Sequence, residues 1–559
     1  MEKFYNILRK ALVIIGVFSM TSCDFLETEP FDFVSPTTFY RNESECTMAL
    51  AAVYYPMATN ILYGNFYSTE MTNIDDLSYY TRNSNFSGKL WANDYTSSTK
   101  EIWDIWAQLY TGIKNANGLL ENIDKAEMDE PIKNRIKGEA KFLRAYYHFL
   151  LVQAFYEVPI RKQSLDDINA ASIPATPHAE ALDWIIEEME DCLSLVDNKE
   201  YDKSPSHVKE NTVYGILARV CLWRAGAPSN GGEAFYKKAA QYANEVYKSK
   251  KHDLNPDVYA MWKCMATDKY DTQYNESIWE VEFIGTRLDN NYTESRIGNT
   301  IGNAQRNGEA SGKGYTYAFY AGTLVLWDLF EKNSTDKRRD LSMAPYYLNA
   351  KDAQVKWKKH EITMRRCGKF RREWETAEAK NKNWTPENYP ILRYADVLLM
   401  LAEAENEVNK QPTDLAYTAL NLVRKRAGIP EVKNLSYDQF QQEVRDERAR
   451  ELCFESIRKF DLVRWGIYTD RMQNVLGAAA ADKRWNSQSQ SDVKADKTGG
   501  KYNFAGTVAA KTEEKHQFYP IPNKELSVNT KLEQNKWSSN PQLSSSASFL
   551  RLNVLSSLN

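Results

Sequence analysis

Apolar residues recur roughly every three to four positions along much of the chain, a spacing that places them on one face of an α-helix. In the segment 101–123, for example, Ile102, Trp106, Leu109 and Ile113 form one such stripe. The pattern predicts helices at Glu101–Ile123, Ile132–Phe155, Ala179–Val196, Thr212–Ala225, Ala234–Lys248, Tyr389–Asn409, Asp414–Ala427 and Tyr437–Lys459. Helices paired through short turns are typical of tetratricopeptide-like repeats, which we expect at about 101–250 and 389–428.

Two long stretches, about 61–93 and 275–388, lose the helical spacing and are rich in Gly, Asn and aromatic residues. Loops of this length inside a folded domain are usually functional rather than mere connections. The sequence therefore predicts a mainly α protein, in which a helical body carries irregular loops that form the ligand face.

The first residues have the pattern of a secretion signal. Lys3, Arg9 and Lys10 precede an apolar run, Ala11–Phe18, which is far shorter than the roughly 20 residues that a membrane-spanning helix needs. Met20-Thr21-Ser22-Cys23 then resembles a bacterial lipobox, with Met20 where Leu is usual. We predict a signal peptide at 1–22, a lipid on Cys23 and a tether at 23–40; cleavage near Ser22 without lipidation is the alternative.

Composition excludes several classes of protein. The 559 residues include 43% hydrophobic and 26% charged residues, as in globular proteins. With 71 Lys and Arg against 75 Asp and Glu, the net charge is -4, so no basic field exists to hold a nucleic acid. Aromatic residues are abundant at 13% of the chain, and their rings become candidates for ligand contacts.

Cysteine and histidine patterns give no sign of a metal site. The seven cysteines form no CxxC pair, and the six histidines form no HExxH motif. Six cysteines remain if Cys23 carries lipid; disulfides are possible outside the cytoplasm, but we expect buried free thiols for most of them.

Motifs of known catalytic sites are also missing, since the chain has neither a GxSxG elbow nor a GxGxxG loop. Asp75-Asp76 is an adjacent carboxylate pair of the kind that could serve glycoside hydrolysis, but turn or helix-capping roles are the simpler interpretation. We expect no enzymatic activity, no cofactor and no metal.

Several segments in the same order resemble the SusD/RagB family, outer-membrane lipoproteins of the Bacteroidota. The resemblance lies in Cys23–Pro30, Ser35–Tyr40, Ala49–Tyr54, Glu447–Gly466, Tyr519–Pro522 and Gln534-Asn535. It implies a SusD-like domain at 41–541 with four tetratricopeptide-like helix pairs, followed by a tail at 542–559.

The resemblance also implies a function. Members of the family bind a glycan, or sometimes a peptide, at the cell surface and deliver it to a SusC-like TonB-dependent β-barrel transporter in the outer membrane. A RagB-like peptide-binding role is the first alternative, and an α-helical glycoside hydrolase is the second.

Starch-binding members of the family carry aromatic rings on two loops. By order along the chain, these loops correspond to Thr72–Asn83 and to the region around Tyr292 and Gly312–Tyr317. The resemblance thus suggests that the ligand-binding residues are Tyr80, Asn83, Tyr292 and Tyr315. Trp91, Trp103 and Trp106 lie beside the helical stripe, and we expect them in the core.

The charges of Glu447–Gly466 recur at helical spacing, which favours a structural role. We expect Glu447, Glu451 and Arg458 to pair along one helix face. The opposite face then packs inward through Leu452, Phe454 and Phe460.

Overall fold

The computed structural model describes residues 39–81, 87–164, 172–197, 204–284, 293, 295–306, 312–358, 361–376, 380–482, 484 and 504–539. Within them helices predominate and strands are short. The predicted signal peptide, Cys23 and the predicted tail lie outside the described residues.

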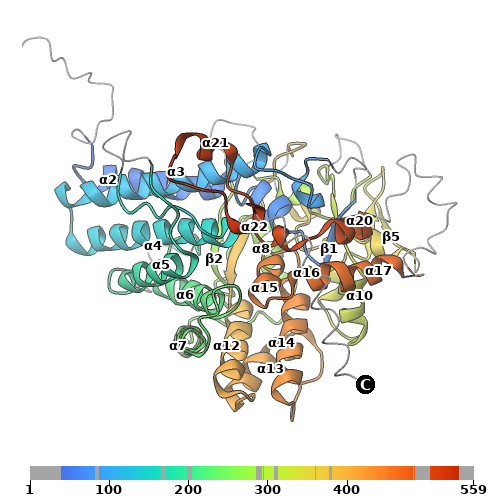
Figure 1. Ribbon diagram of the computed structural model, residues 1–559. Coiled ribbons are helices and arrows are strands. Elements are labelled where there is room, and N and C mark those ends of the chain that lie inside the picture. The colour runs from blue at the N-terminus through green and yellow to red at the C-terminus, as the bar shows by residue number, and fades with distance from the viewer. Residues whose placement is uncertain are drawn as a thin grey trace, which may run out of the picture.

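Long helices form a continuous stack that begins in the left half of Figure 1 and continues to its lower edge. In chain order they are α2 (Glu43–Tyr54), α3 (Lys100–Asn122), α4 (Glu130–Phe155), α5 (His178–Cys192), α6 (Glu210–Ala225), α7 (Glu233–Ser249), α12 (Tyr394–Asn409), α13 (Asp414–Ala427) and α14 (Tyr437–Leu452). Each helix from α2 to α7 contacts the next, α7 contacts α12, and α12 contacts both α13 and α14. The mainly α fold is confirmed, and the tetratricopeptide character of the pairs stays a prediction.

One predicted helix begins too early. Residues 389–393 are not its first turn but strand β6 (Tyr389–Arg393), and α12 starts at Tyr394. Pro390 is the local reason, because a residue that precedes proline is driven away from helical geometry. The whole strand is buried and pairs with β2 (Ser277–Val281), so the residues before α12 are held in a sheet.

Another predicted helix, Tyr437–Lys459, is broken into two. Helix α14 ends at Leu452. After it, Phe454 and Ser456 adopt positive φ angles of 64° and 62°, and α15 (Arg458–Arg464) then begins as a separate helix. The Lys369 ammonium donates to the carbonyl oxygens of Glu451 and Cys453, at 2.8 and 2.9 Å, and so satisfies polar groups that the helix end leaves free.

The buried charges of Glu447–Gly466 hold these elements together, as predicted, but not with the predicted partners. Glu451 pairs with Arg338, Arg393 and Arg426, and all four side chains are less than 10% exposed. Because the helix breaks, Arg458 instead pairs with Asp76, with 2.8 Å between Nε and Oδ1.

Three antiparallel two-stranded sheets join distant segments. Strand β1 (Ser78–Tyr80) pairs with β3 (Tyr320–Gly322), with Tyr80 opposite Tyr320. Strand β2 pairs with β6, and β4 (Tyr346–Leu348) pairs with β5 (Gln354–Lys356). Through β1 and β3, the two stretches that lack helical spacing come together, and Figure 1 shows β1 and β5 in the right half of the molecule, across from α7.

Shorter helical elements fill the space between the stack and these sheets. They are η1 (Tyr55–Ala58), the π-helix η2 (Phe66–Met71), η3 (Leu90–Ala92), η4 (Ile123–Lys125), α8 (Ala260–Ala266), α9 (Ile297–Thr300), α10 (Leu324–Glu331), α11 (Arg339–Ser342), η6 (Ile362–Met364), η7 (Arg372–Trp374), α16 (Tyr468–Asp470), the π-helix η8 (Arg471–Leu476), α17 (Gly477–Ala481), α20 (Phe504–Lys511), η10 (Glu514–Gln517), α21 (Asn523–Val528) and α22 (Lys536–Ser539).

One apolar core runs through the helical stack and under the loops. Trp91 and Trp106 are buried in it as predicted, and Trp103 is half-buried at its edge. The six cysteines of the described part are free thiols; five are buried and Cys264 is half-buried, in agreement with the prediction for most of them.

Candidate functional site

Five aromatic side chains form a continuous row, which we call the aromatic ladder. Trp91 stacks on Tyr80 with ring centroids 4.1 Å apart, and Tyr80 contacts Phe319 at 5.1 Å. Phe319 stacks on Tyr317 at 5.2 Å, and Tyr317 meets Tyr315 edge-on at 5.0 Å. Trp91 is buried, whereas the other four rings are half-buried. The ladder therefore leads from the core to the surface.

Backbone pairing explains why these rings come into line. The segment 315–319 continues from β3 and alternates between half-buried and buried residues, so that every second side chain turns outward. The Thr81 amide donates to the Phe319 carbonyl at 2.7 Å, which brings the β1 loop against this segment. On the other side, the Tyr317 amide donates to the Asn299 carbonyl at 2.8 Å.

Arg372 fixes the outer end of the ladder from beneath. Its guanidinium donates to the Tyr315 carbonyl at 2.7 Å and pairs with Glu375, and its side chain is fully buried. Gly314 passes directly over this group with a φ of 80°, and an added Cβ would lie 3.0 Å from the guanidinium carbon. Glycine is thus required both by the positive φ and by the close approach.

A cation and a further ring flank the ladder. The guanidinium carbon of Arg296 lies 6.0 Å from the Tyr317 ring and 5.9 Å from the ring of Trp384, which is half-buried. The ammonium of Lys382 lies 5.6 Å from the Tyr315 ring. Cationic side chains thus lie beside the aromatic rings along this row.

Glu70 supplies a carboxyl group near the same rings. It lies on the π-helix η2, a rare element that is frequent at functional sites. Burial raises the pKa of Glu70 to about 7, and Glu101 adds to the rise, while Lys89 and Arg296 act to lower it. Among the described residues, none donates a hydrogen bond to this carboxyl group.

Two of the four predicted ligand-binding residues lie among the described residues. The structure brings Tyr80 and Tyr315 into one ladder, although they are distant in sequence. Asn83 and Tyr292 lie outside the described residues, as does Cys23. Their roles stay predictions.

Sequence reasoning missed Phe319, Arg296 and Trp384, and it did not select Tyr317. The alternation of aromatic residues at 315, 317 and 319 was a readable signal, since a period of two places side chains on one face of an extended segment. Nothing in the sequence pattern pointed to Arg296 or Trp384.

The carboxylates of Asp75-Asp76 serve structure. Asp75 accepts from the amides of Leu77 and Ser78, at 2.8 and 3.0 Å, which is the predicted turn role. For Asp76 the turn interpretation is wrong, because its buried carboxylate pairs with Arg458 and Arg471. Burial alone would raise the pKa of Asp76, but the two guanidinium groups outweigh it and hold that pKa at about 2.

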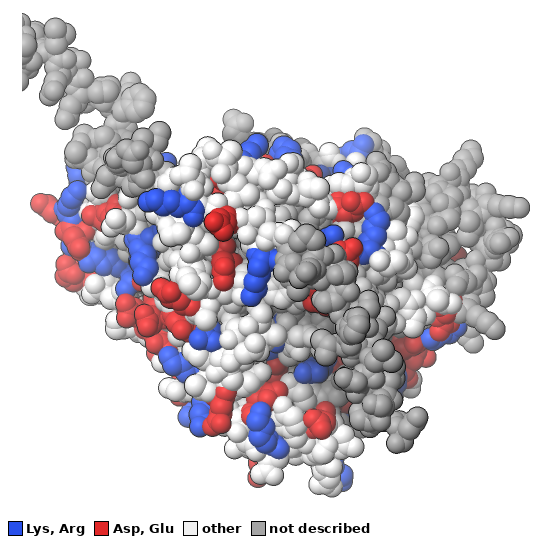
Figure 2. Space-filling view, viewed as in Figure 1, with Lys and Arg blue, Asp and Glu red and all other residues white. Residues whose placement is uncertain are grey.

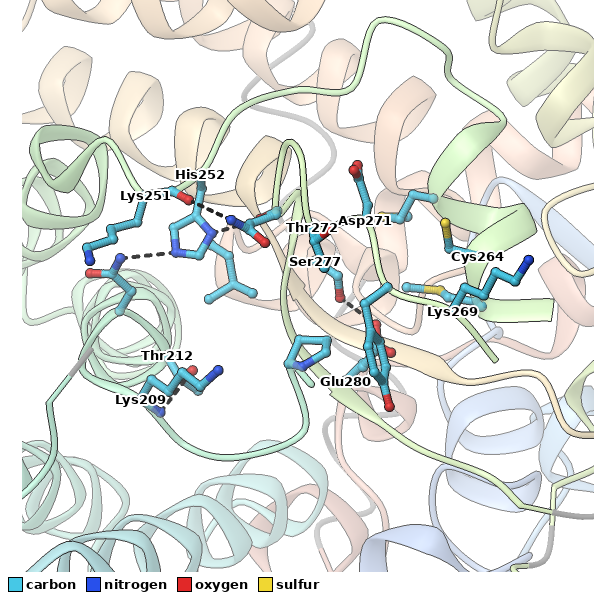
Figure 3. Close-up of a pocket in the computed structure, with 17 residues that line it drawn as sticks. Lys209, Thr212, Lys251, His252, Cys264, Lys269, Asp271, Thr272, Ser277 and Glu280 are labelled. Atoms are coloured by element: carbon cyan, nitrogen blue, oxygen red, sulfur yellow. Dashed lines mark hydrogen bonds between the residues drawn. The ribbon is translucent and has the colours of Figure 1, made fainter. Parts of the chain in front are cut away.

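A separate cavity of about 290 Å³ lies between α6, α7, α8 and β2 (Figure 3). Its polar groups are largely engaged: His252 contacts the Asn275 carbonyl at 2.7 Å, and Glu280 accepts from Ser277 at 2.7 Å. Among the described lining residues, Tyr270 alone carries a Phe, Tyr or Trp ring. The cavity therefore lacks the row of rings that marks the ladder.

A further hollow, of about 460 Å³, lies under α2 and is lined largely by apolar side chains such as Leu50, Met57 and Val281. Its lining also includes the rings of Tyr54, Tyr55 and Trp279 and polar side chains such as His207 and Glu282, but most of the lining surface is apolar, which gives a polar ligand few partners. The ladder is therefore the better candidate site for a ligand with hydroxyl groups.

No cluster of three or more His, Cys, Asp or Glu side chains suited to a metal ion occurs among the described residues. In the same part of the chain, no helix combines the length and apolar character needed to cross a membrane.

The chain belongs to the SusD family. A family model described as "SusD family" matches residues 275–537, and a second, described as "Starch-binding associating with outer membrane", matches residues 24–222. Tyr80 and Trp91 fall in the second match and Tyr315, Tyr317 and Phe319 in the first, so the ladder joins the two matched regions.

Individual relatives agree with this assignment. SusD-like protein P25 of Formosa agariphila is 25% identical over an alignment of 511 positions that covers 83% of this chain and 91% of that protein. The crystal structure of a SusD homologue from Bacteroides thetaiotaomicron matches with a TM-score of 0.78 and 25% identity, over 89% of this chain and 98% of the other.

Surface glycan-binding protein A from the same organism, solved in complex with laminarihexaose, matches with a TM-score of 0.67 over 88% of this chain and 99% of the other. At 17% identity this likeness shows the shared fold.

Proposed function

We propose that this protein is a cell-surface glycan-binding protein and that oligosaccharides bind along the aromatic ladder. The observation that carries the proposal is the row of four half-buried rings, flanked by Arg296, Lys382 and Glu70. Sugars present flat C–H faces that pack on aromatic rings, and their hydroxyl groups need directional polar partners beside those rings.

The comparisons support the same class of ligand. A structural neighbour is named as a surface glycan-binding protein and was solved with laminarihexaose, and one matching family model is described as starch-binding. Neither fixes the glycan that this chain binds, because the ladder residues themselves decide that.

The contacts of the carboxylates support glycan binding without hydrolysis. Glycoside hydrolysis needs two carboxyl groups on opposite sides of the scissile bond. Asp75 and Asp76 are buried and engaged in structural contacts.

A polysaccharide affinity gel tests the proposed function directly. Purified protein is run in native gels that contain laminarin, starch, xylan, polygalacturonate or a sulfated galactan, with bovine albumin as the control for non-specific retardation. We expect retardation by at least one polysaccharide and no release of reducing ends. Absence of retardation by all of them, together with binding to a peptide pool, would point to the RagB-like alternative.

Delivery and anchoring complete the proposal. Cys23, after the signal-like residues 1–22, carries a lipid that holds the protein at the outer membrane, where the glycan passes to a SusC-like TonB-dependent transporter. Support comes from the lipobox-like sequence and from the family description that names the outer membrane.

The anchor is tested by Cys23→Ala in cells that lack the transporter. Because the lipid is the membrane signal of the mature chain in this account, the variant should leave the membrane fraction and become soluble. A variant that still sediments with the outer membrane would contradict the lipid anchor.

A further inference from the structure

Arg296 differs from the other arginines beneath and beside the ladder. Its guanidinium forms no hydrogen bond and no ion pair with a described residue, and its Nε atom is buried without a partner. By contrast, Arg372 and Arg366 are buried and donate to carbonyl oxygens of the ladder segment, at 2.7 and 3.0 Å. A buried N–H group without an acceptor is costly, and a ligand that supplies the acceptor removes the cost.

The position of Arg296 makes it accessible to a ligand on the ladder. The side chain is half-buried between the rings of Tyr317 and Trp384, which restrict its orientation. Its backbone is held as well, since its amide donates to the Gly64 carbonyl at 2.8 Å. A fixed guanidinium with free N–H groups presents the planar fork that matches carboxylate and sulfate oxygens.

Charges around the ladder compensate Arg296 only in part: the Glu70 carboxyl acts on its guanidinium, but burial raises the pKa of Glu70 to about 7, so this carboxyl is partly neutral near pH 7. Lys382 lies over Tyr315, and Lys313 precedes the ladder segment, so further positive charge lies at its outer end. Glu375 is neutralised by Arg372. On the face shown in Figure 2, acidic and basic side chains are interspersed, so this face carries no general basic field.

We propose that Arg296 is an anion subsite and that the cognate glycan is acidic, with a carboxylate or sulfate group bound by this guanidinium. The adjoining sugar rings stack on Tyr317 and its neighbours. The inference rests on the proposed function and narrows it from glycans in general to uronic or sulfated ones.

Matched pairs of polysaccharides test this inference. Polygalacturonate is compared with its methyl-esterified form, and a sulfated galactan with its desulfated form, by affinity gel and by calorimetry on the derived oligosaccharides. Wild-type protein should bind at least one acidic polymer, bind its neutral counterpart more weakly, and lose affinity as salt concentration rises. The two pairs distinguish a carboxylate from a sulfate.

Three variants test whether the affinity for the acidic oligosaccharide depends on Arg296. Arg296→Gln should weaken binding of the acidic oligosaccharide about 10- to 100-fold, the range expected for charge-assisted hydrogen bonds. Arg296→Lys should retain part of the affinity, since it keeps the charge without the fork. Arg445→Gln is the matched control: Arg445 lies on α14, its half-buried guanidinium is 5.1 Å from the Trp465 ring, and it also has an unpartnered Nε.

The outcomes separate the inference from the proposed function. If neutral glycans bind and Arg296→Gln leaves every affinity unchanged, the acidic subsite is wrong and the glycan-binding role stands. If Arg296→Gln and Arg445→Gln weaken binding equally, the effect is not specific to this subsite and the inference is wrong. If no polysaccharide of either kind binds, the proposed function itself is wrong.

Discussion

Glu70 lies beside the aromatic ladder and titrates close to neutral pH. Burial raises its pKa to about 7; Glu101 of α3 adds to the rise, Lys89 and Arg296 oppose it, and Tyr320 of β3 lies near the same carboxyl group. Below that pH the group is neutral and leaves the positive charge of Arg296 available. Above it, Glu70 is negative, compensates Arg296 and repels an acidic ligand.

Affinity for an acidic oligosaccharide should therefore fall as pH rises from about 6 to about 8, by several-fold. Glu70→Gln should flatten the profile, because it removes the titrating group and keeps the shape. Calorimetry across this pH range on both proteins measures the effect. A wild-type profile that is flat, or that rises with pH, would contradict this role of Glu70.

At this scale the sequence identified two of the ladder residues and not their neighbours. Tyr80 and Tyr315 were found because they lie in loops that the family resemblance highlighted. Phe319 was missed although its spacing from Tyr315 and Tyr317 was a readable signal, whereas Trp384 escaped notice because a single ring in a loop has no periodic signal that tells a surface position from a core position. Arg296 could not be singled out, since its lack of a partner is a property of its surroundings.

Buried charge pairs connect the elements behind the ladder. Glu451 of α14 accepts from Arg338, Arg393 and Arg426, and it is 4% exposed. Burial would raise the pKa of Glu451, but these cations outweigh it and hold the pKa well below the usual range. Its removal leaves three buried guanidinium groups short of a carboxylate.

Glu451→Ala should cost about 3–5 kcal/mol of stability, the range for breaking one side of a buried pair, and lower the melting temperature by several degrees. Glu233→Ala is the control, because Glu233 and its partner Lys237 are both exposed, at 62% and 61%. Differential scanning calorimetry measures both variants, and we expect the control to melt like the wild type. An unchanged melting temperature combined with lost glycan binding would show that Glu451 belongs to a binding site instead.

Helical elements were predicted well where the apolar spacing is long and uninterrupted. Helices α3, α4, α6, α7 and α13 begin and end within a few residues of the predicted limits. The prediction failed where tertiary contacts override local pattern. Strand β6 forms because its residues pair with β2. The helix breaks after Leu452, where Lys369 donates to carbonyl oxygens of the turn and Arg393 donates to the Glu455 carboxylate.

For the whole molecule, the sequence established the mainly α class, and the family resemblance placed ligand loops on a helical body. Spacing alone could not show that residues near 80 and near 320 meet, because the β1–β3 pair joins segments that lie far apart in the chain. Long-range pairing of this kind leaves no local pattern, and only the structure joins the two loops into one surface.

Glycan binding by the aromatic ladder is the central claim, and calorimetry on Tyr80→Ala/Tyr315→Ala tests it most directly. Tyr247→Ala, which removes a half-buried ring on α7, serves as the control. Each lost ladder ring should cost about 0.5–1.5 kcal/mol, by analogy with aromatic pairs, so the double variant should bind the oligosaccharide about tenfold or more weakly while the helical body stays folded. Wild-type affinity in the double variant, or an equal loss in the control, would contradict the account.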